Sequence, residues 1–164
     1  MGATLVDVTV VRPLRHAVLR PGRPAGESAY PGDLDPGTAH AAVRARRDTG
    51  PAAPAVLAVG TVLSSPPPWA PRTPGWRIRG MATVESVRGR GMGRLVLDTL
   101  LEHVTRQGGG LVWCAARVGA AAFYQRAGFE TRDAPFDLPG IGSHVHMWRT
   151  VEHAPFDREA AVPT

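Results

Sequence analysis

The chain has 164 residues and a formal net charge of +5, from 19 basic and 14 acidic side chains. This length fits one hydrophobic core, and no apolar stretch reaches the roughly 20 residues that a membrane-spanning helix needs. The single cysteine, Cys114, excludes an internal disulfide framework.

The first half of the chain alternates short apolar runs with proline- and glycine-rich connections. The expected elements are a strand at residues 5–11, a short helical turn at 14–19, and strands at 40–46 and 55–63 joined by a turn at 47–51. Residues 22–37 and the five-proline stretch at 64–75 predict loops on the surface. The first half therefore predicts mainly antiparallel strands.

The second half has stronger periodicity. The expected elements are a strand at 76–84, a glycine loop at 88–93, an amphipathic helix at 95–106, a buried strand at 111–116, a helix at 117–127 and a strand at 143–148. We expect one domain over residues 1–151 and a loosely held tail over 152–164. The start of the chain has no basic segment followed by an apolar one, which favours a cytoplasmic protein.

The glycine loop is the most informative segment. It reads Arg88-Gly89-Arg90-Gly91-Met92-Gly93, between an expected strand and the start of a helix. Glycines at alternate positions let backbone N–H groups face a ligand, and a helix N-terminus favours negative charge. The chain has no lysine, which excludes an NTPase P-loop, and Arg94 stands where a dinucleotide fingerprint requires glycine. The loop predicts an anion-binding cradle, although a glycine-rich turn that only caps a helix remains an alternative.

Two motifs resemble one known family. The loop fits the pattern Arg-x-x-Gly-x-Gly and resembles the acetyl-CoA pyrophosphate loop of the GNAT N-acetyltransferases. Residues 120–129 are similar to the segment A-x-x-F-Y-x-x-x-G-F of the same family, in the right order and spacing. The chain is therefore identified as a member of the GNAT superfamily, similar to a bacterial branch whose acceptors are mostly unassigned. The resemblance covers residues 76–149 well and residues 1–75 only loosely.

The resemblance implies a fold and an activity. The fold is a single α/β (α+β) domain with a central, mixed, twisted sheet, a splay between two parallel strands and helices on both faces. The activity is transfer of an acetyl group from acetyl-CoA to a primary amine of a small molecule or a peptide N-terminus, with CoA as product. Direct attack in a ternary complex is expected, and a homodimer is possible. A CoA-sensing module without turnover is the alternative.

The all-arginine basic residues also leave nucleic-acid binding open. The arginines are scattered, however, and only residues 44–47 hold a tight cluster. An anionic cofactor already accounts for the arginines of the glycine loop. We therefore expect neither a nucleic-acid nor a membrane partner, and we interpret the arginine usage as the coding bias of a GC-rich bacterial genome.

The resemblance also implies which residues bind the cofactor. The strand before the loop contacts the thioester arm through its backbone, and one N–H near Ala82 or Thr83 polarises the carbonyl. Arg117 stands where many members have an asparagine, which weakens the transfer of that contact. The expected cofactor-binding residues are Met81, Ala82, Thr83, Val84, Arg88, Gly89, Arg90, Gly91, Met92, Gly93, Arg94 and Arg117.

Tyr124 is the expected general acid, because its phenol falls where the family's tyrosine approaches the CoA sulfur. The alternative is a core tyrosine with a solvated oxygen. Glu85, just past the splayed strand, is the candidate general base or else a solvated loop residue. His40 and His144 titrate near neutrality and are further candidates, with a structural role as the alternative for each.

Two further patterns carry weaker interpretations. His144 and His146 alternate along one strand, but no third metal ligand is evident, so we expect no metal. Asp33 and Asp35 could attract a cationic amine or simply solvate a turn. The identity of the acceptor is not determined by these residues.

Overall fold

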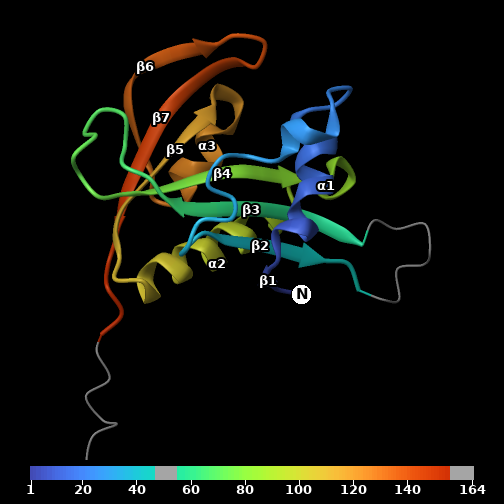
Figure 1. The fold of residues 1–164 in the computed structure, drawn as a ribbon, viewed down its shortest axis with the longest axis horizontal. Coiled ribbons are helices and arrows are strands. Elements are labelled where there is room, and N and C mark those ends of the chain that lie inside the picture. The colour runs from blue at the N-terminus through green and yellow to red at the C-terminus, as the bar shows by residue number, and fades with distance from the viewer. Residues whose placement is uncertain (47–54, 156–164) are drawn as a thin grey trace, which may run out of the picture.

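A computed structural model describes residues 1–46 and 55–155 of the chain. These residues form one seven-stranded sheet with helices on both faces (Figure 1). The strands, in the order in which they lie in the sheet, are β1 (Ala3–Val6), β2 (Ala39–Arg44), β3 (Val56–Ser64), β4 (Trp76–Thr83), β5 (Gly110–Arg117), β7 (Gly142–Val151) and β6 (Glu130–Leu138). The predicted turn at 47–51 and the tail beyond residue 155 lie outside the described residues.

The helices are α1 (Val8–Leu19), α2 (Met92–Arg106) and α3 (Ala121–Arg126), with short 3-10 turns at Ala25–Ser28, Glu85–Val87 and Val118–Ala120. The loop predicted at 22–37 contains no strand, and in the loop predicted at 64–75 only Ser64 belongs to one, as the last residue of β3. The last residue of α2, Arg106, is the predicted one. The helix predicted at 117–127 is shorter, because Arg117 ends β5 and a 3-10 turn precedes α3. Within the described residues, no helix combines the length and apolarity needed to cross a membrane.

The prediction of a strand over residues 5–11 is wrong beyond Val6. Asp7 caps α1, because its carboxylate accepts a hydrogen bond from the backbone N–H of Thr9 at 2.9 Å. Val8, Val11 and Arg15 then form the buried side of a helix of twelve residues. The helix contains Pro13 and runs through it, at the loss of one backbone hydrogen bond.

Two apolar clusters lie on opposite faces of the sheet. Val11 of α1 packs with Ala42 and Val59, whereas the residues of α2 pack with Ala41 and Val43. Consecutive residues of a strand point to opposite faces, so α1 covers one face and α2 the other (Figure 1). The predicted α/β architecture is confirmed.

The parallel strands β4 and β5 separate after a short pairing. Their register holds only Trp76 opposite Val112 and Arg77 opposite Trp113, although each strand has eight residues. Beyond this point no strand among the described residues pairs with β4 on the side of β5. The predicted splay between two parallel strands is therefore confirmed.

A bulge in β4 lies next to this divergence. Gly80 has a φ of +63°, and the pairing of β4 with β3 shifts register between Val59 and Thr61. A Cβ on Gly80 would lie 2.8 Å from Nε of Arg15, so the backbone requires glycine both for its conformation and for the close approach of Arg15. The bulge bends β4 where the strands part.

The sequence analysis missed one strand, β6. This edge strand contains Pro135, and its pairing with β7 is interrupted between Arg132 and Phe136, where Asp133 has a φ of 60°. Most of its residues are partly or fully exposed, so it shows no apolar alternation. Edge strands tolerate proline and bulges because one side makes no ladder.

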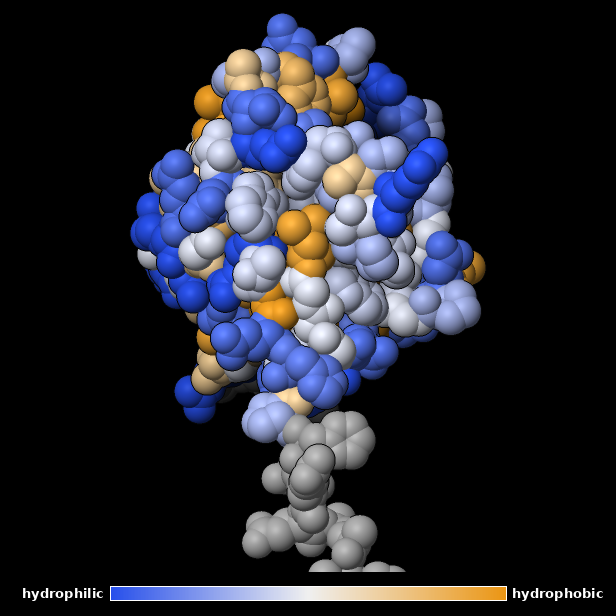
Figure 2. Space-filling view, turned by 90° about the vertical axis from the view of Figure 1, so that its left-hand side faces the viewer, coloured by the Kyte–Doolittle hydropathy of each residue, from blue (hydrophilic) through white to orange (hydrophobic). Residues whose placement is uncertain are grey.

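The face of the molecule in Figure 2 is mostly hydrophilic. Figure 2 shows one face on which apolar residues lie in separate groups among hydrophilic ones. Among residues 1–46 and 55–155, the exposed large apolar side chains are Met1, Leu5, Leu34, Val118 and Ile141.

Candidate active site

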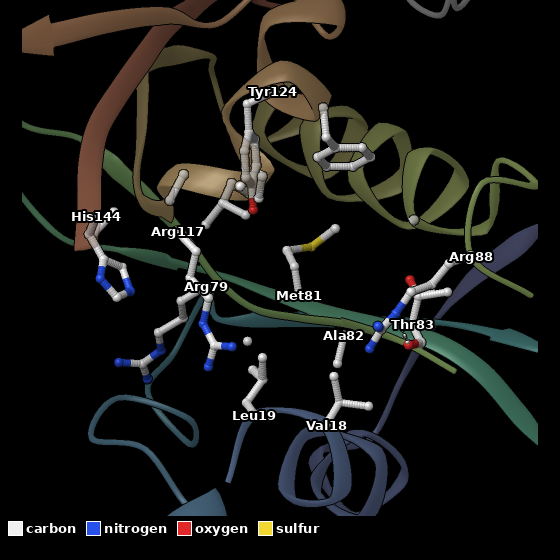
Figure 3. A pocket seen from close by; sticks show the side chains of 18 of the residues that line it. Val18, Leu19, Arg79, Met81, Ala82, Thr83, Arg88, Arg117, Tyr124 and His144 are labelled. Carbon is white, nitrogen blue, oxygen red and sulfur yellow. Dashed lines mark hydrogen bonds between the residues drawn. The ribbon is translucent and has the colours of Figure 1, made fainter. Parts of the chain in front are cut away.

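A cavity of about 1090 Å³ opens where β4 and β5 diverge. Its wall combines the end of α1, residues 77–83 of β4, the glycine loop, the start of α2, the end of β5 and α3. In Figure 3, Arg88 and Thr83 lie at one end and Arg79, Arg117 and His144 at the other, with Met81 between them. One cavity therefore joins the glycine loop to a second, arginine-rich end.

The glycine loop has the geometry of an anion cradle. Gly89 and Gly91 have φ values of +75° and +82°, and no atom lies within 4 Å of the Cβ that either would carry. Gly91 is the N-cap of α2, and no side chain caps this helix. Since the first N–H groups of a helix have no partner within it, they are available to an anionic ligand at this edge of the cavity.

The other residues of the expected cofactor site are mostly in the cavity wall. Gly93 packs closely, since a Cβ there would lie 3.4 Å from Oγ1 of Thr83 and 3.5 Å from Phe123. The expected residues that line the cavity are Met81, Ala82, Thr83, Arg88, Gly89, Gly91, Met92, Gly93, Arg94 and Arg117. Val84 and Arg90 do not line it, and Arg90 is exposed.

The comparisons with known proteins agree with this geometry. The profile of the Acetyltransferase (GNAT) family matches residues 25–129. The chain belongs to the GNAT family. YitI of Bacillus subtilis (strain 168), an uncharacterized N-acetyltransferase, is 28% identical over 138 residues, which are 84% of this chain and 88% of YitI.

Solved GNAT structures share the fold at low sequence identity. ElaA of Escherichia coli superposes with a TM-score of 0.68 at 18% identity, covering 90% of this chain and 97% of its own. An acyl-CoA N-acyltransferase of Pseudomonas aeruginosa gives 0.66 at 21% identity, covering 91% and 99%. The family assignment makes this protein an acetyl-CoA-dependent acyltransferase.

Tyr124 of this GNAT enzyme lies on α3 with its ring in the core and its hydroxyl toward the cavity (Figure 3). The side chain is 6% exposed and packs edge-on against Phe123 and Phe129. Burial raises the pKa of Tyr124 well above its ordinary value. The phenol therefore holds its proton at neutral pH.

His144 lies on β7 in the arginine-rich end of the cavity. Its Nδ1 lies 2.8 Å from the carbonyl oxygen of Gly142, which can only accept a hydrogen bond. In the neutral ring Nδ1 therefore holds the proton, and the lone pair is on Nε2. His144 is 5% exposed and lines the cavity, so the structure brings it to the site.

The other proposed bases lie elsewhere. Glu85 is exposed on the 3-10 turn after β4 and is not part of the cavity wall. His40 is buried on β2, with Nδ1 2.8 Å from Oγ1 of Thr61 and Nε2 2.9 Å from the carbonyl oxygen of Asp33. Its contacts are structural, which matches the alternative given for it.

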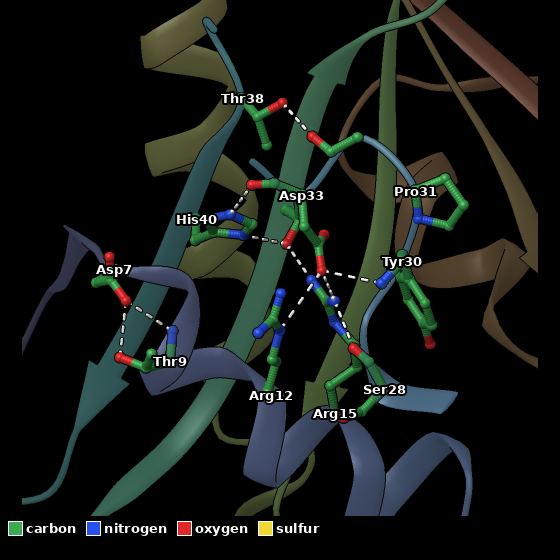
Figure 4. Close-up of polar contacts among 12 residues, drawn as sticks. Asp7, Thr9, Arg12, Arg15, Ser28, Tyr30, Pro31, Asp33, Thr38 and His40 are labelled. Carbon is green, nitrogen blue, oxygen red and sulfur yellow. Dashed lines mark hydrogen bonds and ion pairs between the residues drawn. The ribbon is translucent and has the colours of Figure 1, made fainter. Parts of the chain in front are cut away.

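The interpretation of Asp33 as an attractant for a cationic amine, or as a solvated turn residue, is wrong. Its side chain is 2% exposed and binds Nη1 of Arg15 at 2.7 Å (Figure 4). Burial alone would raise its pKa, but hydrogen bonds from Arg15 and from the N–H of Tyr30 hold the pKa of Asp33 below its usual value. It is a charged partner within the core and does not line the cavity.

Sequence reasoning missed the arginines at the end of the cavity away from the glycine loop. Arg77 and Arg79 lie on β4, and Arg20 is the C-cap of α1, far from them in the sequence and outside any motif. The weak available signal was period-two spacing, which puts Arg77 and Arg79 on one face of a strand.

Proposed function

We propose that this enzyme transfers the acetyl group of acetyl-CoA to a primary amine by direct attack in a ternary complex. The observation that supports this most is one continuous cavity with an anion cradle at one end, Tyr124 in its wall and His144 near the other end. No cysteine or serine of the described chain lines it. Burial raises the pKa of the Cys114 thiol to about 12, which makes it a poor nucleophile and argues against an acyl-enzyme.

The residues of the cradle fit a pyrophosphate. The positive φ of Gly89 and Gly91, the open space beside them and the uncapped start of α2 leave backbone donors for phosphate oxygens. Arg88 keeps part of its guanidinium free of the hydrogen bond that its Nε donates to the carbonyl of Thr83 at 3.3 Å. When bound, acetyl-CoA would supply the activated acetyl group, and unpaired backbone N–H groups of β4 would polarise its carbonyl.

Amine acylation needs one proton donor and one proton acceptor, and Tyr124 and His144 supply them. The Tyr124 hydroxyl donates a proton to the leaving thiolate, and the lone pair on Nε2 of His144 accepts one from the attacking amine. Glu85 remains the alternative base, acting through water from the exposed turn after β4.

The test is a screen of primary amines with acetyl-CoA, following release of the CoA thiol, with Tyr124→Phe as the variant. We expect this variant to lower kcat by about 10²–10⁴-fold and to leave the KM for acetyl-CoA unchanged. An unchanged kcat would contradict the acid role. Calorimetric binding of acetyl-CoA without turnover of any amine would instead favour the CoA-sensing alternative.

A further inference from the structure

Resting on the acetyltransferase function above, we propose that the acceptor amine also carries an anionic group, a carboxylate or a phosphonate. The arginines at the end of the cavity away from the glycine loop bind this group. Arg20, Arg79 and Arg117 are its direct ligands, and Arg77 adds positive charge behind them.

The charge of the cavity wall has one sign. Every charged residue that lines it within the described chain is an arginine, and neither aspartate nor glutamate is present. At the glycine loop such charges suit the phosphates of the cofactor. Figure 3 places Arg79 and Arg117 together with His144 away from that loop, where the phosphates would not reach if they occupy the cradle. These arginines therefore have a different anion to bind.

The protein itself does not neutralise this end of the cavity. Three arginines share the carboxylate of Asp33: Nη1 of Arg15 at 2.7 Å, Nη2 of Arg79 at 3.4 Å and Nε of Arg12 at 3.9 Å. Arg15 is fully buried and takes the shortest contact. One negative charge thus faces three positive ones, and of these three arginines Arg79 is the one that lines the cavity.

Neighbouring groups hold these guanidinium groups in place. Arg79 donates to the carbonyl of Pro31, and its Cζ lies 5.2 Å from the ring centre of Tyr30. Arg20 approaches the same ring at 6.0 Å and donates to the carbonyl of Leu19 at 2.8 Å. Arg77 stacks on the ring of Trp113 at 4.9 Å. Preordered planar guanidiniums are suited to two-point binding of carboxylate or phosphonate oxygens.

Arg117 completes the site from the opposite strand. It ends β5 directly opposite His144 of β7 in the register of the two strands. No ion-pair partner of Arg117 is found in the part of the chain that the structure describes. An anion held between Arg79 and Arg117 would bring an attached amine close to His144.

The same charges disfavour a polycationic acceptor. A polyamine or an aminoglycoside would bring further cations beside fixed arginines with no carboxylate to pair with them. The arginines attract the anionic group of an anionic amine. Their positive charge also lowers the pKa of the ammonium group of the same molecule. More of it would then be in the neutral form that attacks the thioester.

The experiment compares matched amines with the full-length enzyme and saturating acetyl-CoA. The pairs are glycine with glycinamide and aminomethylphosphonate with methylamine, and spermidine is the cationic probe. We expect kcat/KM for each anionic amine to exceed that of its neutral partner by about tenfold or more, and spermidine to be the poorest acceptor. The carboxylate and phosphonate arms identify which anion is preferred.

Two variants connect the preference to the site. Arg79→Gln and Arg20→Gln should each raise the KM for the anionic amine by about tenfold or more, with the KM for acetyl-CoA unchanged. Arg106→Gln is the matched control, because Arg106 is 66% exposed on α2 and pairs with Glu102 away from the cavity. Retained preference in both arginine variants would overturn the proposal, and so would equal or better turnover of the neutral or cationic amines.

A binding measurement separates this inference from the proposed function. Calorimetric titration of glycine and aminomethylphosphonate into the CoA-saturated enzyme needs no turnover. Binding that is weakened in Arg79→Gln but is followed by no acetylation would support the anion site and contradict the acetyltransferase function. Acetylation of amines without any preference for an anion would leave the function standing and overturn the acceptor class. Absence of both binding and turnover would overturn the anion site as well.

Discussion

His40, Thr61 and Arg15 form a hydrogen-bonded chain whose proton positions are determined by its two ends. The carbonyl of Asp33 can only accept, so Nε2 of His40 donates to it and Nδ1 accepts from the hydroxyl of Thr61. The oxygen of Thr61 in turn accepts from Nη2 of Arg15 at 2.7 Å (Figure 4). Protonation of His40 would reverse the hydrogen bond between Nδ1 and Oγ1, and the hydroxyl proton of Thr61 would lose His40 as its acceptor.

This arrangement predicts a pH dependence of stability. Burial is the main cause that lowers the pKa of His40 from its ordinary 6.5, so between 6.5 and the lowered native value the unfolded chain binds more protons than the folded one. The free energy of unfolding should therefore decrease as the pH falls below about 6.5. His40→Gln should flatten this slope in urea titrations at pH 7 and pH 5. His153→Gln, at an exposed position, is the control and should keep the slope.

His144 and Glu85 make opposite predictions about the catalytic base. His144→Gln should lower kcat by about 10²-fold or more, because no other imidazole or carboxylate of the described residues lines the cavity to accept the amine proton. Glu85→Gln should leave kcat close to that of the parent. The reverse result, a large loss in Glu85→Gln alone, would assign the base to the exposed turn.

The junction of the glycine loop and α2 is the element that is expected to hold the cofactor. Gly91 combines a φ of +82° with the N-cap position, and a β-branched residue is strained in that conformation. Gly91→Val should tilt the first N–H groups of α2 away from the cavity and raise the KM for acetyl-CoA about tenfold. The KM is measured by thiol release at a fixed amine concentration.

Gly26→Val is a matched control for this variant. Gly26 also has open space around its Cβ position, but its φ is not positive and it lies in the 3-10 turn after α1. The control should bind acetyl-CoA like the parent. An unchanged KM in Gly91→Val, with its folding intact by circular dichroism, would count against the cradle.

Among the elements, the early divergence of β4 from β5 creates the cavity. After the pairing of Arg77 with Trp113 the two strands are free to separate, and the bulge at Gly80 bends β4 over the side chain of Arg15. Side chains of α1, β4, β5, α3 and β7 can then reach one space. The geometry of this strand pair explains why residues distant in sequence share a site.

At the scale of the whole molecule, the two faces of the sheet have different roles. The face with α2 and α3 holds the larger apolar cluster, including Tyr124 and Phe129. The face with α1 holds the smaller cluster and the buried ion pair of Arg15 with Asp33. The cavity lies between these regions. The apolar cluster packs beneath one side of it, and the buried ion pair lies beneath the other.

Elements with local signals can be predicted from the sequence. The glycines of residues 88–93, the apolar periodicity of α2 and the run at 111–116 predicted the loop, the helix and β5, because backbone conformation and burial follow directly from these residue types. Together with the segment at 120–129, they were enough to predict the family and the splayed sheet. The resemblance of residues 120–129 to the family segment also predicted that Tyr124 faces the site, and Tyr124 lines the cavity.

Tertiary structure alone decided the part of the site away from the glycine loop. Arg20, Arg79 and Arg117 have no common motif, and only the fold of α1 against β4 and the divergence of β5 bring them to one space. Asp33 looked like a turn residue until its burial beside Arg15 was visible. Charge and proton positions depend on neighbours that are remote in the chain, and a local pattern carries no information about those neighbours.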